Sequence, residues 1–332
     1  TDTMQVCVSS SARVHVNRID MTGCASRTVG GLGFRLSEPK ISVFISTVNS
    51  TLDIAPLKQP SIVLSVAKEL GLPDNLSICV SSSFGKHIGL GYETQLNLCL
   101  LKGLFLLANK PFTSLEACRY RIGQISGIGS GSFFYGGFVV DGGYPCIKGN
   151  KKVLNGLHCE RPAPVIFKNQ FPVEWKVILA IPKSANSLSG ESEAAFFDHI
   201  TPICEKHAHE LSYYILLGVL PALIEKDFTA FIESMTQICR LGTKPHEEEL
   251  NAGLSGLLLR YLRKEYGFAS VSSLGPSVFS FTQRMIDLDF LHKTFSEFRF
   301  ITTTVENSPM QITTNPEQIQ NLYNNTQYSR SN

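Results

Sequence analysis

The sequence predicts an α+β fold arranged as two domains. The chain has 332 residues, about twice the size of a common domain. Its first half mixes segments rich in β-branched residues with segments of helical periodicity, whereas its second half carries a block of consecutive helices between strand-like segments. We therefore expect a mixed first domain over residues 1–170 and a helix-rich second domain over residues 171–305.

The elements of the first domain follow from residue type and period. Alternation of apolar and polar residues, or an excess of β-branched and aromatic ones, marks strands, and apolar residues three and four positions apart mark helices. On these criteria the predicted strands are 5–16, 41–47, 76–81 and 133–140, and the predicted helices are 61–70 and 92–108.

The second domain is predicted to open with a buried strand at 175–181 (WKVILAI). Strands near 269–273 and 297–304 bracket a final helix. The segment 306–332 is rich in Asn, Gln and Thr and poor in large apolar residues, so we expect a polar, loosely attached C-terminal tail. The helices expected between the first two strands lie at about 191–210, 211–224, 227–241 and 247–265.

Composition excludes two classes of partner. Thirty Lys and Arg against 28 Asp and Glu give a net charge of +2 without a block of like charges, so nucleic acid is not expected as a partner. The longest apolar runs, 96–108 and 215–224, are shorter than the ~20 residues of a membrane helix. No signal-peptide pattern opens the sequence, and its nine cysteines form no Cys-x-x-Cys pair. These features favour a cytoplasmic protein with reduced thiols.

A glycine-rich turn precedes the strongest predicted helix, in KHIGLGYETQLNL (86–98). Gly89 and Gly91 allow positive φ and close approach of a ligand to the backbone, and the N–H groups at a helix start attract an anion. The pattern is neither a Walker A loop nor a dinucleotide fingerprint. It predicts a phosphate cradle with contacts from Lys86, Gly89, Leu90, Gly91, Thr94 and Gln95, although a glycine turn without a ligand is the alternative.

A second glycine-rich run, SGIGSGSFFYGGFVVDGG (126–143), holds seven glycines around the predicted strand 133–140. Glycine weakens a strand, so this density indicates close approach by a ligand or by another backbone segment. Ser126 and Gly127 are candidates for phosphate binding. Asp141, at the end of the strand, is a candidate site carboxylate, and a simple Asp-Gly turn is the alternative.

Two further segments carry polar groups suited to phosphates. In VSSLGPSVF (271–279), hydroxyls and amides beside a Gly-Pro turn are candidate substrate contacts, although a serine-rich turn explains them too: Ser272, Ser273, Gly275 and Ser277. Near the N-terminus, Arg13, His15, Asp20 and Arg27 precede a predicted Gly-Gly-x-Gly turn at 30–33. Arginine makes paired, charge-assisted contacts with phosphates. His15 and His87 are explained equally well as structural residues.

Taken together and in this order, these segments resemble the β-ribofuranosylaminobenzene 5′-phosphate synthase family, a branch of the GHMP kinase superfamily. The resemblance covers about 300 residues. It rests on RVHVNRIDMTG with Arg27 and GGLG, on HIGLGYETQL, on SGIGSGSFFYGGFVVDGG, on PVEWKVILAIP with LSGESEAAF, on LPALIEKDFTAF, and on SSLGPSVF.

The resemblance implies an N-terminal domain like the second domain of ribosomal protein S5 and a C-terminal ferredoxin-like domain. It implies a decarboxylating transfer in methanopterin-type pterin biosynthesis, from phosphoribosyl pyrophosphate to 4-aminobenzoate or 4-hydroxybenzoate. It further implies Mg²⁺ as cofactor and a homodimer. Within it, Asp20, Arg27 and Asp141 are the expected catalytic residues, with Arg13 on phosphate.

Three positions depart from the related patterns and leave alternatives open. Gly129 stands where mevalonate-kinase-like members carry an Asp that assists phosphoryl transfer, which favours ribosyl transfer over an ATP-dependent small-molecule kinase. Phe134 and Leu274 stand where the synthases usually have Glu and Trp. These two changes motivate a third hypothesis, a catalytically silent relative.

Overall fold

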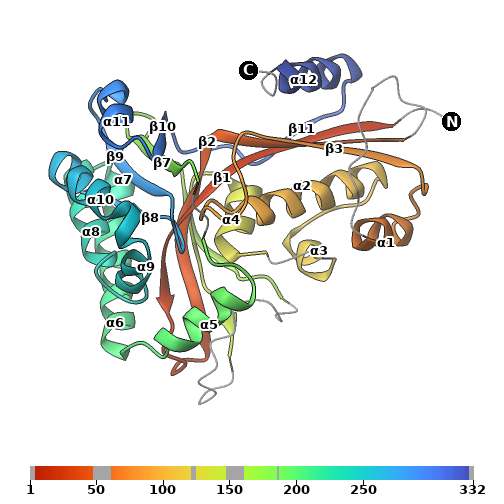
Figure 1. Ribbon diagram of the computed structural model, residues 1–332. Helices are drawn as coiled ribbons and strands as arrows, with labels where there is room; N and C mark the ends of the chain where they lie inside the picture. Colours follow the sequence, from red (N-terminus) through yellow and green to blue (C-terminus); the bar gives the residue numbers. More distant parts are fainter. Residues whose placement is uncertain (1–3, 48–60, 121–124, 147–160, 185–186, 329–332) are drawn as a thin grey trace.

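Two antiparallel sheets form the framework of the protein. Figure 1 shows the computed structural model, which describes residues 4–47, 61–120, 125–146, 161–184 and 187–328. The larger sheet has the order β11-β1-β2-β4-β6, and β3 and β5 also pair with β2. Its strands are β1 (Gln5–Asp20), β2 (Arg27–Thr47), β3 (Leu76–Ser82), β4 (Phe138–Asp141), β5 (Tyr144–Pro145), β6 (Val165–Asn169) and β11 (Gln311–Thr313).

The smaller sheet has the order β10-β7-β9-β8, and most of the later helices surround it (Figure 1). Its strands are β7 (Lys176–Pro182), β8 (Ser270–Val271), β9 (Val278–Thr282) and β10 (Phe298–Thr303). The helices are α1 (Ser61–Glu69), α2 (Tyr92–Leu107), α3 (Ser114–Arg119), α4 (Gly127–Tyr135), α5 (Glu191–Ile200), α6 (Glu205–Tyr214), the π-helix η1 (Ile215–Val219), α7 (Leu220–Glu225), α8 (Phe228–Ile238), α9 (Lys244–Leu250), α10 (Ala252–Tyr266), α11 (Leu288–Thr294) and α12 (Pro316–Tyr328).

One aromatic core joins the two sheets. The ring of Phe34, in β2, lies 6.1 Å from that of Phe138 in β4 and 5.7 Å from that of Phe281 in β9, measured between centroids. Because these rings come from both sheets and are buried in one cluster, the sheets cannot move apart without exposing it. The loop before β9 is thereby held against β1, where the Ser273 N–H donates to the His15 carbonyl at 2.9 Å.

The predicted turn at 30–33 is wrong, because these residues lie inside the long strand β2. Glycine is needed there for packing. A Cβ on Gly33 would lie 2.2 Å from the Val14 carbonyl oxygen and 2.6 Å from the Ile128 side chain. The missing side chains let α4 lie directly on the sheet.

The predicted strand 133–140 is also wrong in its first part. Residues 127–135 form α4, and the strand β4 starts only at Phe138. The Ser126 hydroxyl caps the helix by accepting from the Gly129 N–H at 3.0 Å. A Cβ on Gly129 would lie 2.5 Å from the Thr94 side chain, so glycine permits close packing of α4 against α2 and outweighs its poor helix propensity.

The segment expected to be a loosely attached tail is ordered from residue 306 to 328. Its β11 pairs with β1 from Cys7 to Ser9, and α12 follows it. Ile319 and Tyr323 are buried against Phe44 and the two cysteines 7 and 79. Two apolar side chains one helical turn apart are enough to attach this otherwise polar helix to the sheet.

The remaining predicted strands and helices are confirmed, with shifted boundaries. The helix expected at 191–210 is interrupted between Ile200 and Glu205, and the one expected at 247–265 is divided at Asn251 into α9 and α10. The strand near 269–273 contains only Ser270 and Val271. The strands β5, β6 and β9 and the helix α3 were not predicted.

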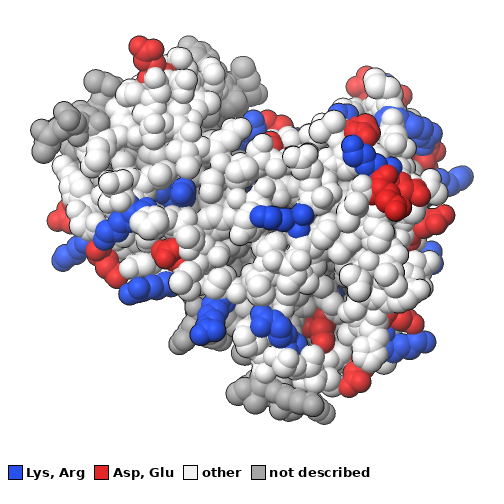
Figure 2. All heavy atoms as spheres, turned by 180° about the vertical axis from the view of Figure 1, so that it is seen from behind, with Lys and Arg blue, Asp and Glu red and all other residues white. Residues whose placement is uncertain are grey.

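Charges are dispersed over the surface. On the face in Figure 2, Lys and Arg stand among Asp and Glu on a mostly uncharged surface, with no continuous area of one sign. Among the described residues, no helix combines the length and the apolar character that crossing a membrane requires.

Candidate active site

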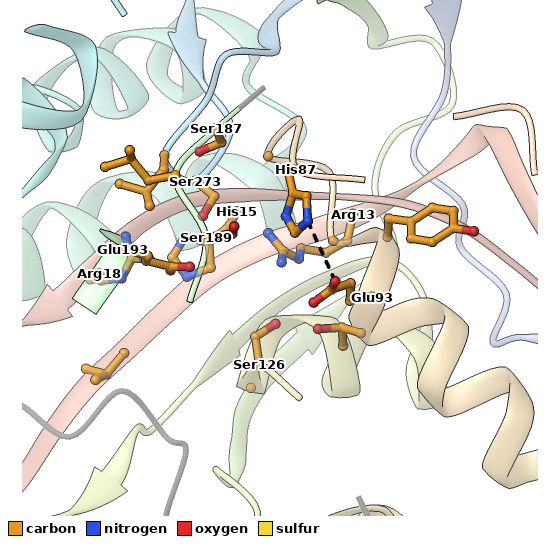
Figure 3. A pocket seen from close by; sticks show the side chains of 18 of the residues that line it. Arg13, His15, Arg18, His87, Glu93, Ser126, Ser187, Ser189, Glu193 and Ser273 are labelled. Carbon is orange, nitrogen blue, oxygen red and sulfur yellow. Dashed lines mark ion pairs between the residues drawn. The ribbon is translucent and has the colours of Figure 1, made fainter. Parts of the chain in front are cut away.

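A polar pocket of about 190 Å³ lies where the two sheets meet. Its walls come from seven segments of the described chain: the second half of β1, Val29 in β2, the loop and first turn of α2, the start of α4, Asp141 with Tyr144, residues 187–193, and Ser273 with Leu274. Figure 3 labels ten of the residues that line it, with His87, Glu93 and Arg13 on one side and Arg18 and Glu193 on the other. We refer to this cavity as the polar pocket.

Three helices begin at the polar pocket. Gly91 precedes α2, Ser126 caps α4 and Gly190 precedes α5, and all three residues line the cavity. A helix N-terminus carries a partial positive charge and N–H groups directed outward. Three of them around one cavity give it a strong preference for anions.

Gly89 and Gly91 shape the loop before α2. Gly89 has φ +81°, and a Cβ there would lie 2.3 Å from the Ser272 carbonyl oxygen. Gly91 has φ +70°, and a Cβ there would lie 2.8 Å from Nε of Arg13. The loop is therefore held between the Ser272 loop on one side and the Arg13 guanidinium on the other.

Arg13 places a buried cation in the polar pocket. Its residue exposure is 7%, and its Nε and Nη1 atoms have no hydrogen-bond partner among the residues that the structure describes. Burial, together with the nearby charge of Arg18, lowers the pKa of the guanidinium to about 10, which leaves it charged at neutral pH. A buried cation without partners is unfavourable, so this group is suited to receive an anionic ligand.

His15 lies beside Arg13 on β1 and is neutral. Burial, followed by the charges of Arg18, Arg13 and Lys244, holds the pKa of His15 well below its usual range. Within the described part of the chain, its Nδ1 atom has no hydrogen-bond partner. A neutral imidazole here can donate or accept one hydrogen bond without adding charge.

Arg18 is held by a buried ion-pair network beneath the polar pocket. Its Nη1 lies 2.6 Å from Oε1 of Glu247, which is fully buried and also bonds Lys244 and Thr243. Lys244 donates further to the carbonyls of Val271 and Ser273 at 3.0 Å. Burial raises the pKa of Glu247, but the charges of Lys244 and Arg18 outweigh it and the pKa is lowered. The network fixes both Arg18 and the loop at Ser273.

Three carboxylates line the same cavity. Asp141 is almost fully buried at the end of β4, and burial raises its pKa to about 7 against the opposing hydrogen bond from Gly143 and the charge of Arg27. Burial also raises the pKa of Glu193, and the charges of Arg18 and Arg13 act in the opposite direction and lower it in part. Glu93 lies 3.9 Å from Nε2 of His87. The pocket therefore pairs anion-binding groups with carboxylates that can face developing positive charge.

Half of the predicted site residues line the polar pocket, and the rest lie around it. Those on its wall are Arg13, Gly89, Gly91, Thr94, Ser126, Gly127, Asp141 and Ser273. The others include residues that build the loops. Gln95 is buried and bonds Ser10 and the Gly129 carbonyl, and Ser272 donates to the Gly89 carbonyl. Residues outside the wall are Asp20, Arg27, Lys86, Leu90, Gln95, Ser272, Gly275 and Ser277.

Asp20 and Arg27 have structural partners on the described chain. The Asp20 carboxylate accepts from the N–H and hydroxyl of Thr22. The Arg27 guanidinium donates to the carbonyls of Gly142 and Gly143, both at 2.7 Å. The two residues line a separate, apolar cavity on the other side of Asp141. Lys86 lies over the ring of Tyr92 at 5.9 Å.

Several wall residues were not predicted: Arg18, Glu93, Ser187, Ser189 and Glu193. Arg18 follows Arg13 by five positions, and the strand irregularity between His15 and Asn17 changes the alternation that would otherwise place the two on opposite faces. Glu193 stands within the quoted motif LSGESEAAF, where its position in the first turn of a helix was the available signal. The Phe134 departure lies among aromatic residues away from the wall, whereas Leu274 lines it.

The residues present are compatible with Mg²⁺ but form no enclosed metal cage. Among the described residues, no group of three or more His, Cys, Asp and Glu gathers as a metal site. Mg²⁺ bound with phosphates needs only one or two protein carboxylates. Glu93 and the hydroxyl of Ser126 line the anion-binding side of the polar pocket and fit that requirement.

Three archaeal proteins, each named beta-ribofuranosylphenol 5′-phosphate synthase, are similar to this chain. The protein from Methanothermobacter thermautotrophicus is 31% identical over 293 residues, covering 84% of this chain and 89% of its own. The protein from Methanocaldococcus jannaschii is 28% identical over 319 residues, covering 88% and 94%. The protein from Archaeoglobus fulgidus is 29% identical over 311 residues, covering 91% and 97%. No family model matches the chain.

Solved structures similar to this one share the GHMP kinase fold. Homoserine kinase from Cytophaga hutchinsonii superposes with a TM-score of 0.59 at 15% identity, covering 94% of this chain and 98% of its own. Mevalonate diphosphate decarboxylase from Staphylococcus aureus superposes with a TM-score of 0.53 at 12% identity, with the same coverages. The GHMP-like fold implied by the sequence motifs is confirmed.

Proposed function

Because this chain belongs to the beta-ribofuranosylphenol 5′-phosphate synthase family of enzymes, we propose that it is a decarboxylating phosphoribosyltransferase. It joins phosphoribosyl pyrophosphate to 4-hydroxybenzoate or 4-aminobenzoate, with release of pyrophosphate and CO₂. The observation that carries this proposal is the unpartnered guanidinium of Arg13, buried where three helix N-termini meet. The relatives' name describes a phenol product, which supports 4-hydroxybenzoate as the acceptor.

The ribosyl donor carries two phosphate-bearing groups, and the polar pocket has donors for anions on several sides. In our proposal the pyrophosphate binds at the start of α2, against Arg13, with the Ser126 end of α4 opposite. Its binding supplies the missing partners of Arg13. The same donors stabilise the charge that accumulates on pyrophosphate as it leaves.

The proposed reaction balances without a net proton change. The bond from C1 of the ribose to pyrophosphate breaks, and the leaving group takes the electron pair. The ring carbon that bears the carboxylate attacks C1, and a carbon–carbon bond forms. The bond to the carboxyl carbon then breaks, CO₂ leaves, and its electron pair restores the aromatic ring.

Positive charge develops on the ribose as pyrophosphate departs, and a carboxylate can stabilise it. Asp141 is our candidate, because it is buried at the start of α4, close enough that a Cβ on Gly127 would lie 2.7 Å from its Oδ2. With a pKa near 7 it is the ionised form that stabilises the ribose. We expect the rate to rise with pH through this range.

We propose Mg²⁺ as the cofactor, held by the donor phosphates and by Glu93 or Ser126. When bound, it neutralises pyrophosphate charge. We also propose that the reaction serves methanopterin-type pterin biosynthesis in the cytoplasm. A homodimer is a further proposal from the family resemblance.

Calorimetry and product assays test the proposal together. Purified protein with Mg²⁺ is titrated with phosphoribosyl pyrophosphate and, separately, with a non-hydrolysable ATP analogue. It is then incubated with the donor and each aromatic acid. We expect binding of the ribosyl donor, and equal amounts of pyrophosphate and CO₂ only when an aromatic acid is present. Binding of the ATP analogue alone would favour a kinase, and donor binding without turnover would favour a silent relative.

A further inference from the structure

The polar pocket has an apolar end that the binding of phosphates does not use. Val29, Leu188 and Leu274 line the cavity and belong to one hydrophobic cluster, in which Met21 and Phe197 are buried behind them. Arg18 marks the same end, because its Cζ lies 4.2 Å from the centre of the Phe197 ring. A flat apolar group fits such a wall, whereas a phosphate does not.

Two charged side chains accompany this apolar end. Figure 3 shows Arg18 and Glu193 together on one side of the cavity, away from His87 and Glu93. Arg18 already uses Nη1 for Glu247, which holds its guanidinium in place. Glu193 lies half-buried in the first turn of α5, and the described chain gives it no ion pair within 4.0 Å. The pair therefore offers one fixed donor and one acceptor.

We propose that this end is the aromatic-acid subsite, with the ring against Leu188 and Leu274 and with Arg18 and Glu193 holding the substituent at position 4. This inference rests on the proposed function. It names the residues that orient the second substrate and that discriminate between its two candidate forms.

The para arrangement of the substrate fits the two ends of the cavity. The carbon that attacks the ribose carries the carboxylate, so it must face the anion-binding side at Arg13. The 4-substituent then points the opposite way, toward Arg18 and Glu193. As the ring carbon attacks, the 4-hydroxyl gives its proton to the Glu193 carboxylate and electron density moves into the ring. After CO₂ leaves, the proton returns to the oxygen.

The same pair favours a hydroxyl group over an amino group. A hydroxyl oxygen accepts from Arg18 and donates to Glu193, so both residues are satisfied. The nitrogen of 4-aminobenzoate donates to Glu193, but its lone pair is delocalised into the ring and is a poor acceptor for Arg18. A site that donates one hydrogen bond to the substituent and accepts another from it therefore discriminates against 4-aminobenzoate.

Glu193→Gln tests the specificity, with Glu191→Gln as its matched control. Glu191 stands in the same first turn of α5 but is exposed and outside the cavity wall. We measure kcat/KM for 4-hydroxybenzoate and 4-aminobenzoate and the Kd of phosphoribosyl pyrophosphate. Because glutamine cannot take the proton of the 4-hydroxyl, we expect kcat/KM for 4-hydroxybenzoate to fall about tenfold or more relative to kcat/KM for 4-aminobenzoate. The donor Kd should stay within about twofold. The control, Glu191→Gln, should keep the wild-type ratio of kcat/KM values and the wild-type donor Kd.

Leu188→Trp tests where the ring binds, because it fills the apolar end without changing charge. Leu217→Trp, on the exposed side of η1, is the control. We expect KM for the aromatic acid to rise about tenfold or more with donor Kd unchanged. If the wild-type chain releases no pyrophosphate with either acid, the proposed function fails and this inference with it. This inference alone is overturned by either of two results in an active enzyme. One is that Glu193→Gln leaves the ratio of kcat/KM for 4-hydroxybenzoate to that for 4-aminobenzoate unchanged, and the other is that Leu188→Trp leaves KM for the aromatic acid unchanged.

Discussion

Lys244 and Arg13 are both buried cations beside the polar pocket, but their surroundings differ. Lys244 is fully buried and donates to the Glu247 carboxylate and to two carbonyls. Arg13 is nearly as buried, yet two of its nitrogens find no hydrogen-bond partner among the described residues. The first arrangement stabilises the folded chain, whereas the second leaves buried donors unsatisfied. This is the difference that we expect between a structural cation and one that binds a ligand.

The largest expected effect comes from breaking the satisfied pair. Lys244→Met leaves Glu247 buried with one cation fewer, so the free energy of unfolding should fall by about 3–5 kcal/mol. Denaturant unfolding measures it. Lys206→Met removes the exposed partner of Glu210 and should change stability by less than about 0.5 kcal/mol. A similar loss of stability in the two variants would show that Lys244 does not stabilise the fold more than an exposed lysine does.

Asp141 extends the comparison to a buried anion with a single amide partner. Its folded-state pKa is about 7, above the usual 3.8, so the folded chain binds this proton more tightly than the unfolded one. Its contribution to stability is thus fully present below about pH 4 and is lost as pH rises through 7. The loss is on the order of 4 kcal/mol. Urea unfolding across this range should show the loss in wild type and in exposed Asp198→Asn, but not in Asp141→Asn.

The next effect falls on binding. Arg13→Met should weaken phosphoribosyl pyrophosphate binding about 100-fold, or about 2.7 kcal/mol, because the ligand loses its buried cation. The melting temperature should stay level or rise, since an unpaired buried charge is removed. Calorimetry and thermal denaturation measure the two quantities. Lys86→Met, outside the cavity wall, is the matched control. A lower melting temperature with unchanged binding would make Arg13 structural.

The smallest expected effect comes from crowding Arg13. Gly91→Ala puts a methyl group 2.8 Å from Nε of Arg13 at a φ of +70°, so the guanidinium must shift. We expect donor affinity to fall about tenfold. Gly253→Ala, where a Cβ meets nothing within 4 Å in α10, should leave affinity unchanged. Equal affinities for both variants would show that the guanidinium position is not critical.

Local sequence predicted elements where period and composition agree with the final packing. The helix starting at Tyr92 and the strand starting at Lys176 are examples. It failed where glycine serves tertiary contact. Gly33 was predicted in a turn, and the run that contains Gly129 was predicted to surround a strand and to be closely approached by an unnamed neighbour. Each glycine makes room for a neighbour distant in sequence, Val14 with Ile128 in one case and Thr94 in the other. No local pattern contains those neighbours.

The candidate site was also predicted only in part from the sequence. The turn at Gly91 predicted the start of a helix, and Asp141 was predicted at the end of a strand. Ser126 was predicted as a phosphate contact, but the helix that it caps was not predicted. Arg18 carried no such signal, and Glu193 carried only its position in the first turn of a predicted helix. Their meeting depends on a strand irregularity and on a helix more than 170 residues away in sequence. Family resemblance supplied Asp20 and Arg27, whose hydrogen bonds on the described chain are to nearby backbone and to Thr22.

The pairing of β1 with β11 also has a consequence for biosynthesis. Cys7 faces Thr313 across the sheet, about 300 positions later in the chain. At a translation rate of about 5–20 residues per second, the strand that carries Arg13 waits on the order of 15–60 s on the ribosome for its outer neighbour. During that time one edge of the nascent strand is unpaired and can join another chain. Chaperone occupancy of this nascent segment should therefore be high until residue 313 emerges.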